Sequence, residues 1–448
     1  MARARCSFCG RDESEVDHLF AGPGGVAICP DCVALAADVA GPTMRPSGGD
    51  LVLTGISELV TNDPRFPGRL GLVEEAAVAI TGGLIDWVGS GSPPSRYGDL
   101  PELQCEGRAV IPGFVDPHTH LVFAGDRSAE YEMRAAGASY QDLRRAGGGI
   151  ASTVAATRSA SPAELLESAL DRVGSMLEHG TTTVEVKSGY GLDTRTEVVL
   201  LEVGRQIGES LPVDVVTTFL GAHSVPPEFA DDRRRYVELV ETSMIPACAG
   251  LASYCDVFCD EGAFTVDESE QILRAGMTAG LKPRIHANQL ADSGGADLAA
   301  RLGAVSADHL EHVTREQARG LREAGVAAVL LPTASWGTRS PAAPARMLWD
   351  ERVTVALGTD CNPGTSYVLS MQLVLAVAVA DAGLALERAL WSATRGGALA
   401  LEEDDKGLVA PGAIADLVVL EADSYRHLGY RPDQNLAAVV IKDGDPVG

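Results

Sequence analysis

The sequence predicts an α/β protein whose main part is a (β/α)8 barrel, with a small β-sandwich domain and a short N-terminal four-cysteine zinc domain. Three observations predict this. Apolar runs alternate with amphipathic stretches through residues 113–399, glycine-bounded apolar runs occur on both sides of that region, and two C-x-x-C pairs precede it. Alternating strands and helices indicate a parallel sheet, and eight repeats over this length suit a closed barrel.

The composition narrows the class of protein. Of 448 residues, 46% are hydrophobic and 5% aromatic, so Ala, Val and Leu should fill the core. The net charge of −26 argues against nucleic acid or an anionic membrane as partner, because both require a basic surface. The polar start M-A-R-A-R-C and the absence of long apolar runs predict a cytoplasmic protein. Nine cysteines, an odd number, argue against a disulfide framework.

The N-terminal segment has the pattern of a structural zinc site. Its four candidate ligands are Cys6, Cys9, Cys29 and Cys32. Four thiolates in paired C-x-x-C knuckles suit a tetrahedral Zn²⁺, on which so small a segment would depend for folding. A redox pair and a chance cluster are the alternatives. We assign residues 1–42 to this zinc-binding domain and the Gly- and Pro-rich residues 43–50 to a linker.

The sequence predicts one composite sheet domain formed by residues 51–112 and 400–448. Short apolar runs bounded by glycine, such as L-V-L-T-G-I near the start and G-A-I-A-D-L-V-V-L near the end, recur in both segments. Such runs are typical of strands joined by turns. Since the barrel lies between the two segments, both chain ends should contribute to this sheet.

The barrel itself is assigned to residues 113–399. Its eight candidate strands are 111–116, 181–187, 213–221, 253–259, 282–287, 304–309, 327–332 and 353–360. Amphipathic stretches at 162–179, 194–209 and 266–280 are candidate helices between them. The long connection at 121–180 is large enough to hold a lid, for which residues 128–160 are the candidate.

Several predicted strands end in residues that bind metals. The ends of these strands carry His118, His120, His286, His309 and Asp360. Active sites of such barrels form where the carboxyl ends of the strands converge. Imidazoles and a carboxylate brought together there suit Zn²⁺ or iron.

The sequence motifs around these residues resemble those of a known family. P-G-F-V-D-P-H-T-H-L-V-F-A-G-D-R, K-S-G-Y-G-L, F-L-G-A-H, I-H-A-N-Q-L, D-H-L-E-H and G-T-D-C-N-P-G-T-S follow in order from residue 112 to residue 366. Together they resemble the imidazolonepropionase family of the amidohydrolase superfamily. The resemblance implies a metal-dependent hydrolase that opens the ring of 4-imidazolone-5-propanoate to give N-formimidoyl-L-glutamate in L-histidine degradation.

The resemblance also assigns roles to individual residues. One catalytic Zn²⁺, Fe²⁺ or Fe³⁺ would be held by His118, His120, His286 and Asp360. Arg127 would bind the propionate carboxylate through its guanidinium fork, although without the motif it would be a surface arginine with a helix partner. The remaining substrate-binding candidates are Tyr190, His223, Gln289, Asn362, Gly364 and Thr365. Tyr190 and His223 could instead be satisfied rim residues, and N-P-G is also ordinary turn chemistry.

Two residues are candidates for the chemical step. Some family members carry glutamate where this chain has Gln289, which cannot accept a proton and is left with an orienting role. Proton transfer is therefore expected to fall to Asp360 as base and then acid, with His309 steadying the oxyanion. Cys361 is expected to be a packed thiol.

Two other functions remain open at this stage. A nucleobase-type deaminase or another cyclic-amide hydrolase of the superfamily would share the metal site but not the carboxylate anchor at Arg127. A docking scaffold with an inactive barrel would belong to a different class, and the complete metal set argues against it.

The N-terminal domain carries a resemblance of its own. C-S-F-C-G and I-C-P-D-C-V within residues 6–40 resemble the N-terminal zinc domain of the Clp protease unfoldase, a protein-binding and dimerising module. The resemblance implies a protein partner for this domain. The barrel family usually dimerises, so a homodimer is the expected assembly.

Overall fold

The protein divides into two compact units, Met1–Gly48 and Gly49–Gly448, in a computed structural model. The structure describes residues 6–7, 11, 20–21, 27–29, 48–137 and 148–447. In the first unit, β1 (Phe20–Ala21) pairs with β2 (Ala27–Ile28) in an antiparallel ladder. Cys6 and Cys29 are both buried, and the Cys29 N–H donates to the Cys6 Sγ at 3.4 Å. Cys9, Cys32 and most of the linker lie outside the described residues.

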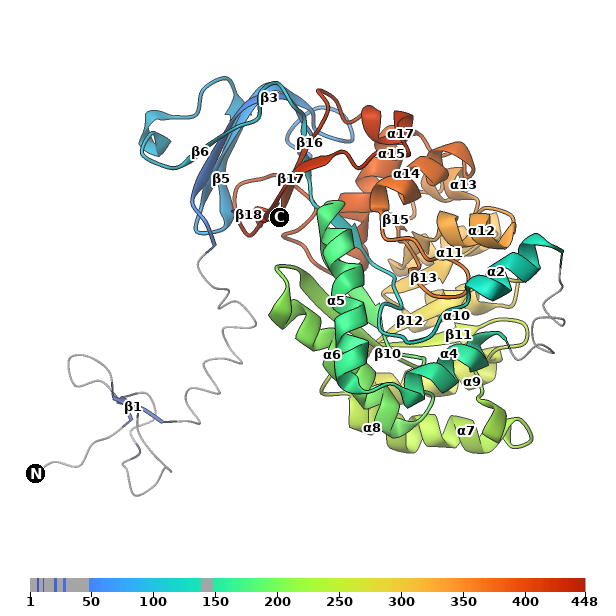
Figure 1. The fold of residues 1–448 in the computed structure, drawn as a ribbon. Helices are drawn as coiled ribbons and strands as arrows, with labels where there is room; N and C mark the ends of the chain where they lie inside the picture. The colour runs from blue at the N-terminus through green and yellow to red at the C-terminus, as the bar shows by residue number, and fades with distance from the viewer. Residues whose placement is uncertain are drawn as a thin grey trace, which may run out of the picture. The chain divides into compact units, whose positions relative to one another are not determined.

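The predicted barrel is confirmed. Eight parallel strands pair in the order β15-β14-β13-β12-β11-β10-β9-β8, and helices surround them (Figure 1). The strands are β8 (Phe114–Asp116), β9 (Thr181–Lys187), β10 (Asp214–Ala222), β11 (Tyr254–Cys259), β12 (Lys282–Ala287), β13 (Ser306–His309), β14 (Ala327–Leu330) and β15 (Val355–Leu357).

The two edge strands of this sheet meet through residues that follow them. Thr119 and Cys361 form a parallel β-bridge. On either side of it, the His120 N–H donates to the Cys361 carbonyl at 2.9 Å, and the Asp360 N–H donates to the His118 carbonyl at 3.0 Å. The barrel is therefore closed at its mouth by the same two segments that carry three candidate metal ligands.

Several helices begin where the sequence supplies a capping side chain. The helices α5, α9 and α11 each start with a capping box, formed by Ser161 with Glu164, Thr265 with Glu268, and Thr314 with Gln317. Each box satisfies two backbone N–H groups that a helix start leaves unpaired. The helices are α2 (Ser128–Ala135), α4 (Ile150–Ser159), α5 (Pro162–Glu178), α6 (Thr194–Ser210), α7 (Arg233–Leu239), α8 (Ile245–Cys248), α9 (Val266–Thr278), α10 (Gly295–Leu302), α11 (Arg315–Ala324), α12 (Pro332–Thr338), α13 (Ala345–Asp350), α14 (Met371–Ala380), α15 (Leu386–Trp391), α16 (Gly397–Ala400) and α17 (His427–Tyr430).

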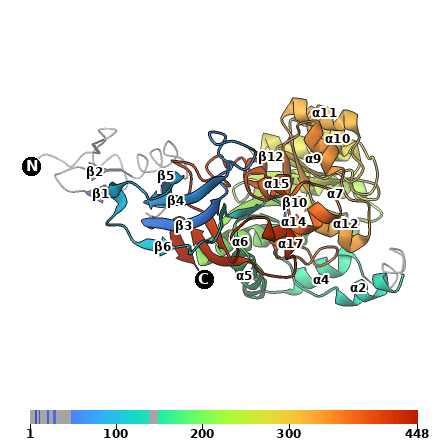
Figure 2. The same cartoon turned by 90° about the horizontal axis from the view of Figure 1, so that it is seen from above.

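A second sheet lies to one side of the barrel (Figure 2). Its strands follow the order β18-β17-β16-β7-β3-β4-β5, with β6 paired to β3, so both chain ends contribute as expected. They are β3 (Leu51–Leu59), β4 (Val73–Thr81), β5 (Leu84–Ser90), β6 (Glu102–Gln104), β7 (Val110–Pro112), β16 (Leu417–Leu420), β17 (Ala437–Lys442) and β18 (Asp445–Val447). Buried side chains from both segments form its own apolar core.

The single strand predicted at 111–116 is wrong in one respect, because Gly113 divides it. The part before Gly113 is β7 of the second sheet, and the part after it is β8 of the barrel. A Cβ at Gly113 would overlap the Thr182 side chain, and its N–H donates to the Asp416 carbonyl. The chain passes from one sheet to the other at this residue. Only glycine fits there, because the backbone lies so close to Thr182.

Ion pairs connect the second sheet to the amino end of the barrel strand β10. Asp214, the first residue of β10, lies 3.0 Å from the Lys442 Nζ and also contacts Lys406. Lys442 in turn lies 3.1 Å from Asp416. Although burial opposes ionisation, the two lysines hold the pKa of Asp214 well below its usual value. Within the described part of the chain, no helix combines the length and apolarity that membrane crossing requires.

Candidate metal centre and active site

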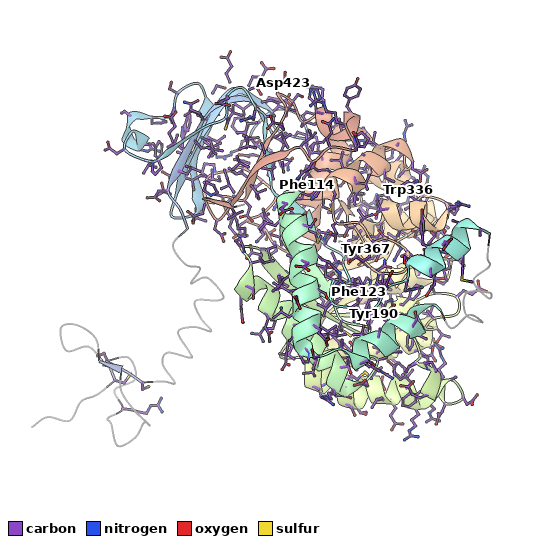
Figure 3. All side chains as sticks on the ribbon, viewed as in Figure 1. Phe114, Phe123, Tyr190, Trp336, Tyr367 and Asp423 are labelled. Atoms are coloured by element: carbon purple, nitrogen blue, oxygen red, sulfur yellow. The ribbon has the colours of Figure 1, made fainter. Side chains whose placement is uncertain are left out.

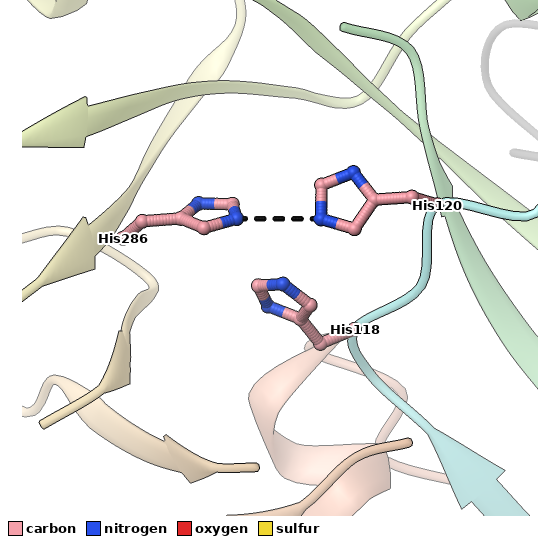
Figure 4. Close-up of side chains that lie close together, drawn as sticks. All are labelled: His118, His120 and His286. Carbon is pink, nitrogen blue, oxygen red and sulfur yellow. Dashed lines mark hydrogen bonds between the residues drawn. The ribbon is translucent and has the colours of Figure 1, made fainter. Parts of the chain in front are cut away.

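Three histidines converge at the carboxyl ends of the barrel strands (Figure 4). His118 and His120 follow β8, and His286 lies on β12. All three side chains are buried, and each offers a ring nitrogen within 4.8 Å of the others'. The prediction that H-x-H at residues 118–120 and the histidine of I-H-A would lie together at the barrel mouth agrees with this placement.

Asp360 lies beside two of these histidines. Its Oδ1 lies 3.6 Å from the His118 Nε2 and 3.5 Å from the His120 Nε2, and the His286 Nε2 is 3.5 Å from the His120 Nε2. Two ligands about 2.1 Å from one tetrahedral ion are themselves about 3.4 Å apart. The His118 Nε2 is also buried without a hydrogen-bond partner among the described residues. The three histidines therefore form a donor set for one cation, and the Asp360 carboxylate lies next to two of them.

Three residues at or near this centre have left-handed backbone conformations. Asp360, His309 and Asn288, which follows His286 by two residues, have φ angles of 49°, 77° and 52°. Non-glycine residues in the left-handed region cost about 1–3 kcal/mol each and persist where the surrounding structure imposes them. Here the strain lies at the ends of β12 and β13 and in the segment after β15. The Asp360 and His309 side chains lie beside the three histidines, whereas the Asn288 amide donates to Asp292 outside the centre.

Two buried aspartates contact the Nδ1 atoms of His118 and His286. The His118 Nδ1 donates to the Asp308 Oδ2 at 2.6 Å, and the His286 Nδ1 lies 3.0 Å from the Asp256 Oδ2. A carboxylate on Nδ1 fixes the tautomer in which Nε2 presents its lone pair, as is usual for metal-binding histidines. The sequence interpretation did not identify Asp256 or Asp308.

Lys187 anchors these aspartates inside the barrel. Its Nζ lies 2.7 Å from Glu185, 2.8 Å from Asp256 and 3.6 Å from Asp308, and all four side chains are fully buried. Arg284, also fully buried, adds a contact of 3.4 Å to Asp308. Burial alone would lower the pKa of Lys187, but the carboxylates outweigh it and raise that pKa. Lys187 is therefore a fixed cation beneath the ligand set.

His309 faces the same centre from the end of β13. Its ring centroid is 5.4 Å from that of His286 and 5.6 Å from that of His118. Behind it, the Glu311 Oε1 lies 3.5 Å from the His309 Nδ1 and accepts a hydrogen bond from the Ser335 hydroxyl. Burial disfavours the charged ring, but Glu311 outweighs it and raises the pKa of His309. His309 is thus suited to donating a proton or hydrogen bond.

Tyr190 and His223 form the wall next to His120. The His223 ring stacks on the His120 ring at 4.9 Å, and the Tyr190 ring lies 5.3 Å from His223. The His223 Nδ1 donates to the Gly189 carbonyl, which leaves its Nε2 for another partner. Burial and the neighbouring His286 lower the pKa of His223 to about 3, so this ring is neutral.

Phe123 holds this wall in place (Figure 3). Its ring lies 6.2 Å from Tyr190 and 5.9 Å from Tyr367. The Arg172 guanidinium stacks on Phe123 at 3.6 Å and donates to the Leu121 carbonyl and the Tyr367 hydroxyl. Arg172 therefore fastens the segment after β8 to the segment after β15.

Arg127 makes the helix contact that was the alternative interpretation of this residue. Its Nε and Nη2 donate to the two carboxylate oxygens of Glu130, at 3.0 and 2.8 Å. The third guanidinium nitrogen, Nη1, faces Gly364, where a Cβ would overlap it. The fork predicted to bind a propionate is thus directed at Glu130, and Nη1 is the atom turned toward the loop of candidate site residues.

The segment after β15 is shaped by Asn362. Its Oδ1 accepts from the N–H groups of Gly364 and Thr365 at 2.8 Å, and its Nδ2 donates to the Asp360 carbonyl. Such a side-chain to backbone pattern is turn chemistry, the alternative considered for N-P-G. Cys361 is fully buried, and burial raises the pKa of its thiol, as expected of a packed cysteine. Gln289 is half-buried and its N–H donates to Asp260.

Comparisons with known proteins agree with this fold. The Amidohydrolase family model matches residues 263–447, and the ClpX C4-type zinc finger model matches residues 4–40. Imidazolonepropionase of Mycolicibacterium smegmatis is 46% identical, with 89% of this chain and 97% of that protein covered. Imidazolonepropionase of Streptomyces coelicolor is 47% identical, with 88% and 98% covered.

Solved structures share the fold at much lower identity. The 5-methylcytosine deaminase of Klebsiella pneumoniae has a TM-score of 0.68 at 18% identity, with 89% of this chain and 97% of that one covered. The zinc complex of atrazine chlorohydrolase from Arthrobacter aurescens has a TM-score of 0.64 at 19% identity, with 88% and 94% covered. These matches show the architecture alone. The two imidazolonepropionases match nearly their whole length, and on that observation the chain belongs to the imidazolonepropionase family of amidohydrolases.

Proposed function

We propose that this protein hydrolyses 4-imidazolone-5-propanoate to N-formimidoyl-L-glutamate, a step of L-histidine degradation. The observation that carries the proposal is the 46% identity to imidazolonepropionase over 97% of that protein's length. The buried set of three imidazoles and one carboxylate supports it, because ring opening of a cyclic amide requires an activated water.

We assign the metal to His118, His120, His286 and Asp360. A Zn²⁺ or iron ion bound by these donors would lower the pKa of water and polarise a carbonyl. We assign a structural Zn²⁺ to Cys6, Cys9, Cys29 and Cys32, in line with the zinc-finger match at residues 4–40. A cytoplasmic location, a homodimer and a protein partner for the zinc finger remain predictions.

The chain's own residues would carry the proton and the developing charge. In the proposed reaction, Asp360 accepts the proton of the attacking water and returns it to the ring nitrogen that leaves the carbonyl carbon. His309, held by Glu311, donates a hydrogen bond to the carbonyl oxygen as it becomes an oxyanion. His223 and Tyr190 would hold the ring beside His120 through the His223 Nε2 and the Tyr190 hydroxyl.

The first prediction pairs metal content with turnover. We expect two metal ions per purified chain, one in each candidate site, and loss of imidazolonepropionate absorbance when the protein is added. In R127A, we expect kcat/KM for this substrate to fall by about 10–100-fold, because a charge-assisted hydrogen bond is worth about 1.5–3 kcal/mol. Absorbance kinetics and elemental analysis measure both quantities.

The rival deaminase function gives different results in the same experiment. Bound metal without turnover of imidazolonepropionate, combined with ammonia release from a nucleobase panel, would place the substrate elsewhere in the superfamily. Equal activity of R127A and the unmodified protein would show that the propionate tail is recognised without Arg127.

A further inference from the structure

A second arginine lies beside Arg127 and has no role in the site described so far. Arg134 is one helical turn after Glu130 on α2, so the two side chains share a face of the helix. The Arg134 Nη2 donates to the Gly364 carbonyl at 2.6 Å. Because the Arg127 Nη1 also lies against Gly364, the two guanidinium groups meet at this glycine.

Glu130 accepts the hydrogen bonds that the Arg127 Nε and Nη2 donate. Besides the two bonds from Arg127, Glu130 accepts from the Gly149 N–H at 3.0 Å and from the Ser152 hydroxyl at 3.3 Å. The exposed fractions of the Arg127 and Glu130 side chains are only 16% and 13%. Four donors hold this carboxylate in place, so Glu130 is a poor candidate to leave Arg127 when a ligand arrives.

Arg134, in contrast to Arg127, has a buried guanidinium nitrogen, Nε, without a hydrogen-bond acceptor among the described residues. Two guanidinium groups and one carboxylate leave one positive charge uncompensated at this place, in a chain whose net charge is −26. Burial and the nearby Arg127 both lower the pKa of Arg134, as expected for a cation that lacks a counter-ion. One carboxylate would supply the missing charge and the missing acceptor.

This cation pair lies close to the metal centre. Burial and the Asp360 carboxylate raise the pKa of Tyr190, and the Arg127 charge opposes them. The Tyr190 ring is 5.7 Å from the ring of the ligand His120. Gly364 itself is connected to Asp360 through Asn362, which bonds to both. A ligand with its ring at the metal centre and a short acidic tail would therefore direct that tail toward Gly364.

We propose that Arg134 is a specificity-determining residue that binds the substrate carboxylate together with Arg127. In this arrangement the Arg134 Nε and the Arg127 Nη1 each donate one charge-assisted hydrogen bond to the carboxylate, and Glu130 serves to position Arg127. Gly364 is glycine because a side chain there would displace the Arg127 guanidinium. The proposal rests on the proposed function and names the groups that select its substrate.

Kinetics of R134M and R134K test this assignment. We expect KM for imidazolonepropionate to rise by about 10–100-fold in R134M while kcat changes by less than about threefold, because the lost bond serves binding rather than chemistry. R134K should recover part of the loss, since lysine restores the charge without the planar geometry. G364A should raise KM in the same way by displacing Arg127. The control R322M removes an exposed arginine of α11 and should match the unmodified protein.

A binding experiment separates this proposal from the proposed reaction. The probe is 3-(imidazol-4-yl)propanoate, a ring with the same tail that the site cannot open, together with its neutral primary amide. Calorimetry should show weaker binding of the acid to R134M and equal binding of the amide to both proteins. Equal binding of the acid to both proteins, or a loss in kcat alone, would overturn the assignment. If the unmodified protein bound the acid in this way but failed to turn over imidazolonepropionate, the proposed reaction would fail and the anion site would stand.

Discussion

Replacing Asp360 with asparagine is expected to lower kcat by about 10²–10⁴-fold, the usual range for loss of a general base. Asparagine keeps the size of the side chain and one oxygen near the His118 and His120 nitrogens, so the three histidines should still hold the metal with reduced affinity. The amide cannot accept the proton of the attacking water. Elemental analysis after gel filtration measures the metal, and substrate absorbance measures the turnover.

The two roles assigned to Asp360 give separable outcomes. Retained metal with lost turnover supports its role as base, and lost metal supports its role as ligand. A variant with bound metal and full activity would exclude the base role and leave His309 as the proton-transfer candidate. D433N, which changes an exposed aspartate after α17, is the matched control and should keep both properties.

The fold was largely accessible from the sequence because each strand and helix carries a local signal. The run T-T-T-V-E-V-K is β9 over the predicted residues, and α5 begins at Pro162, the first residue of the predicted helix 162–179. The division of the first strand was not accessible. It depends on Thr182 lying against Gly113, a contact between residues far apart in the chain that no local pattern encodes.

The metal-binding candidates were likewise predictable, but the charges behind them were not. His118 and His120 stand in H-x-H at a strand end, which is a local pattern. Lys187 and Asp256 gave a weaker signal, as charged residues within apolar strands. Their pairing depends on the register of neighbouring strands, in which Asp308 lies opposite His286 and Asp256 lies two residues before the partner of His286.

The orientation of Arg127, the predicted propionate-binding residue, could not be predicted from the sequence either. A motif identified Arg127, but its fork contacts Glu130 and only Nη1 faces Gly364. The direction of a long side chain depends on the helix that follows it, and α2 places both Glu130 and Arg134 within reach. Sequence alone therefore named the residue and could not say which of its nitrogens is free.

Lys187→Met is expected to lower the free energy of unfolding by about 3–5 kcal/mol, because removing one partner of a buried ion pair leaves the other charge uncompensated. Lys187 is fully buried and neutralises Glu185 and Asp256. Asp308 would still have Arg284 as a partner after the substitution. Methionine fills much of the same volume, so the loss reflects charge rather than a cavity. Denaturant unfolding of the metal-free proteins measures it, since bound metal would itself stabilise the folded state.

The same substitution should weaken metal binding by about 10–100-fold, as is usual when a group that orients metal ligands is lost. Asp256 and Asp308 hold His286 and His118, and both would shift toward remaining cations or bind protons once Lys187 is gone. Competition with a chelator measures the affinity. Lys282→Met is the matched control, because Lys282 pairs with Glu402 at the surface, where 58% of its side chain is exposed, and exposed pairs contribute about 1 kcal/mol or less. If K187M and K282M behaved alike in both measurements, the buried cation would have no part in fixing the ligand histidines, and Asp256 and Asp308 would have to orient them without it.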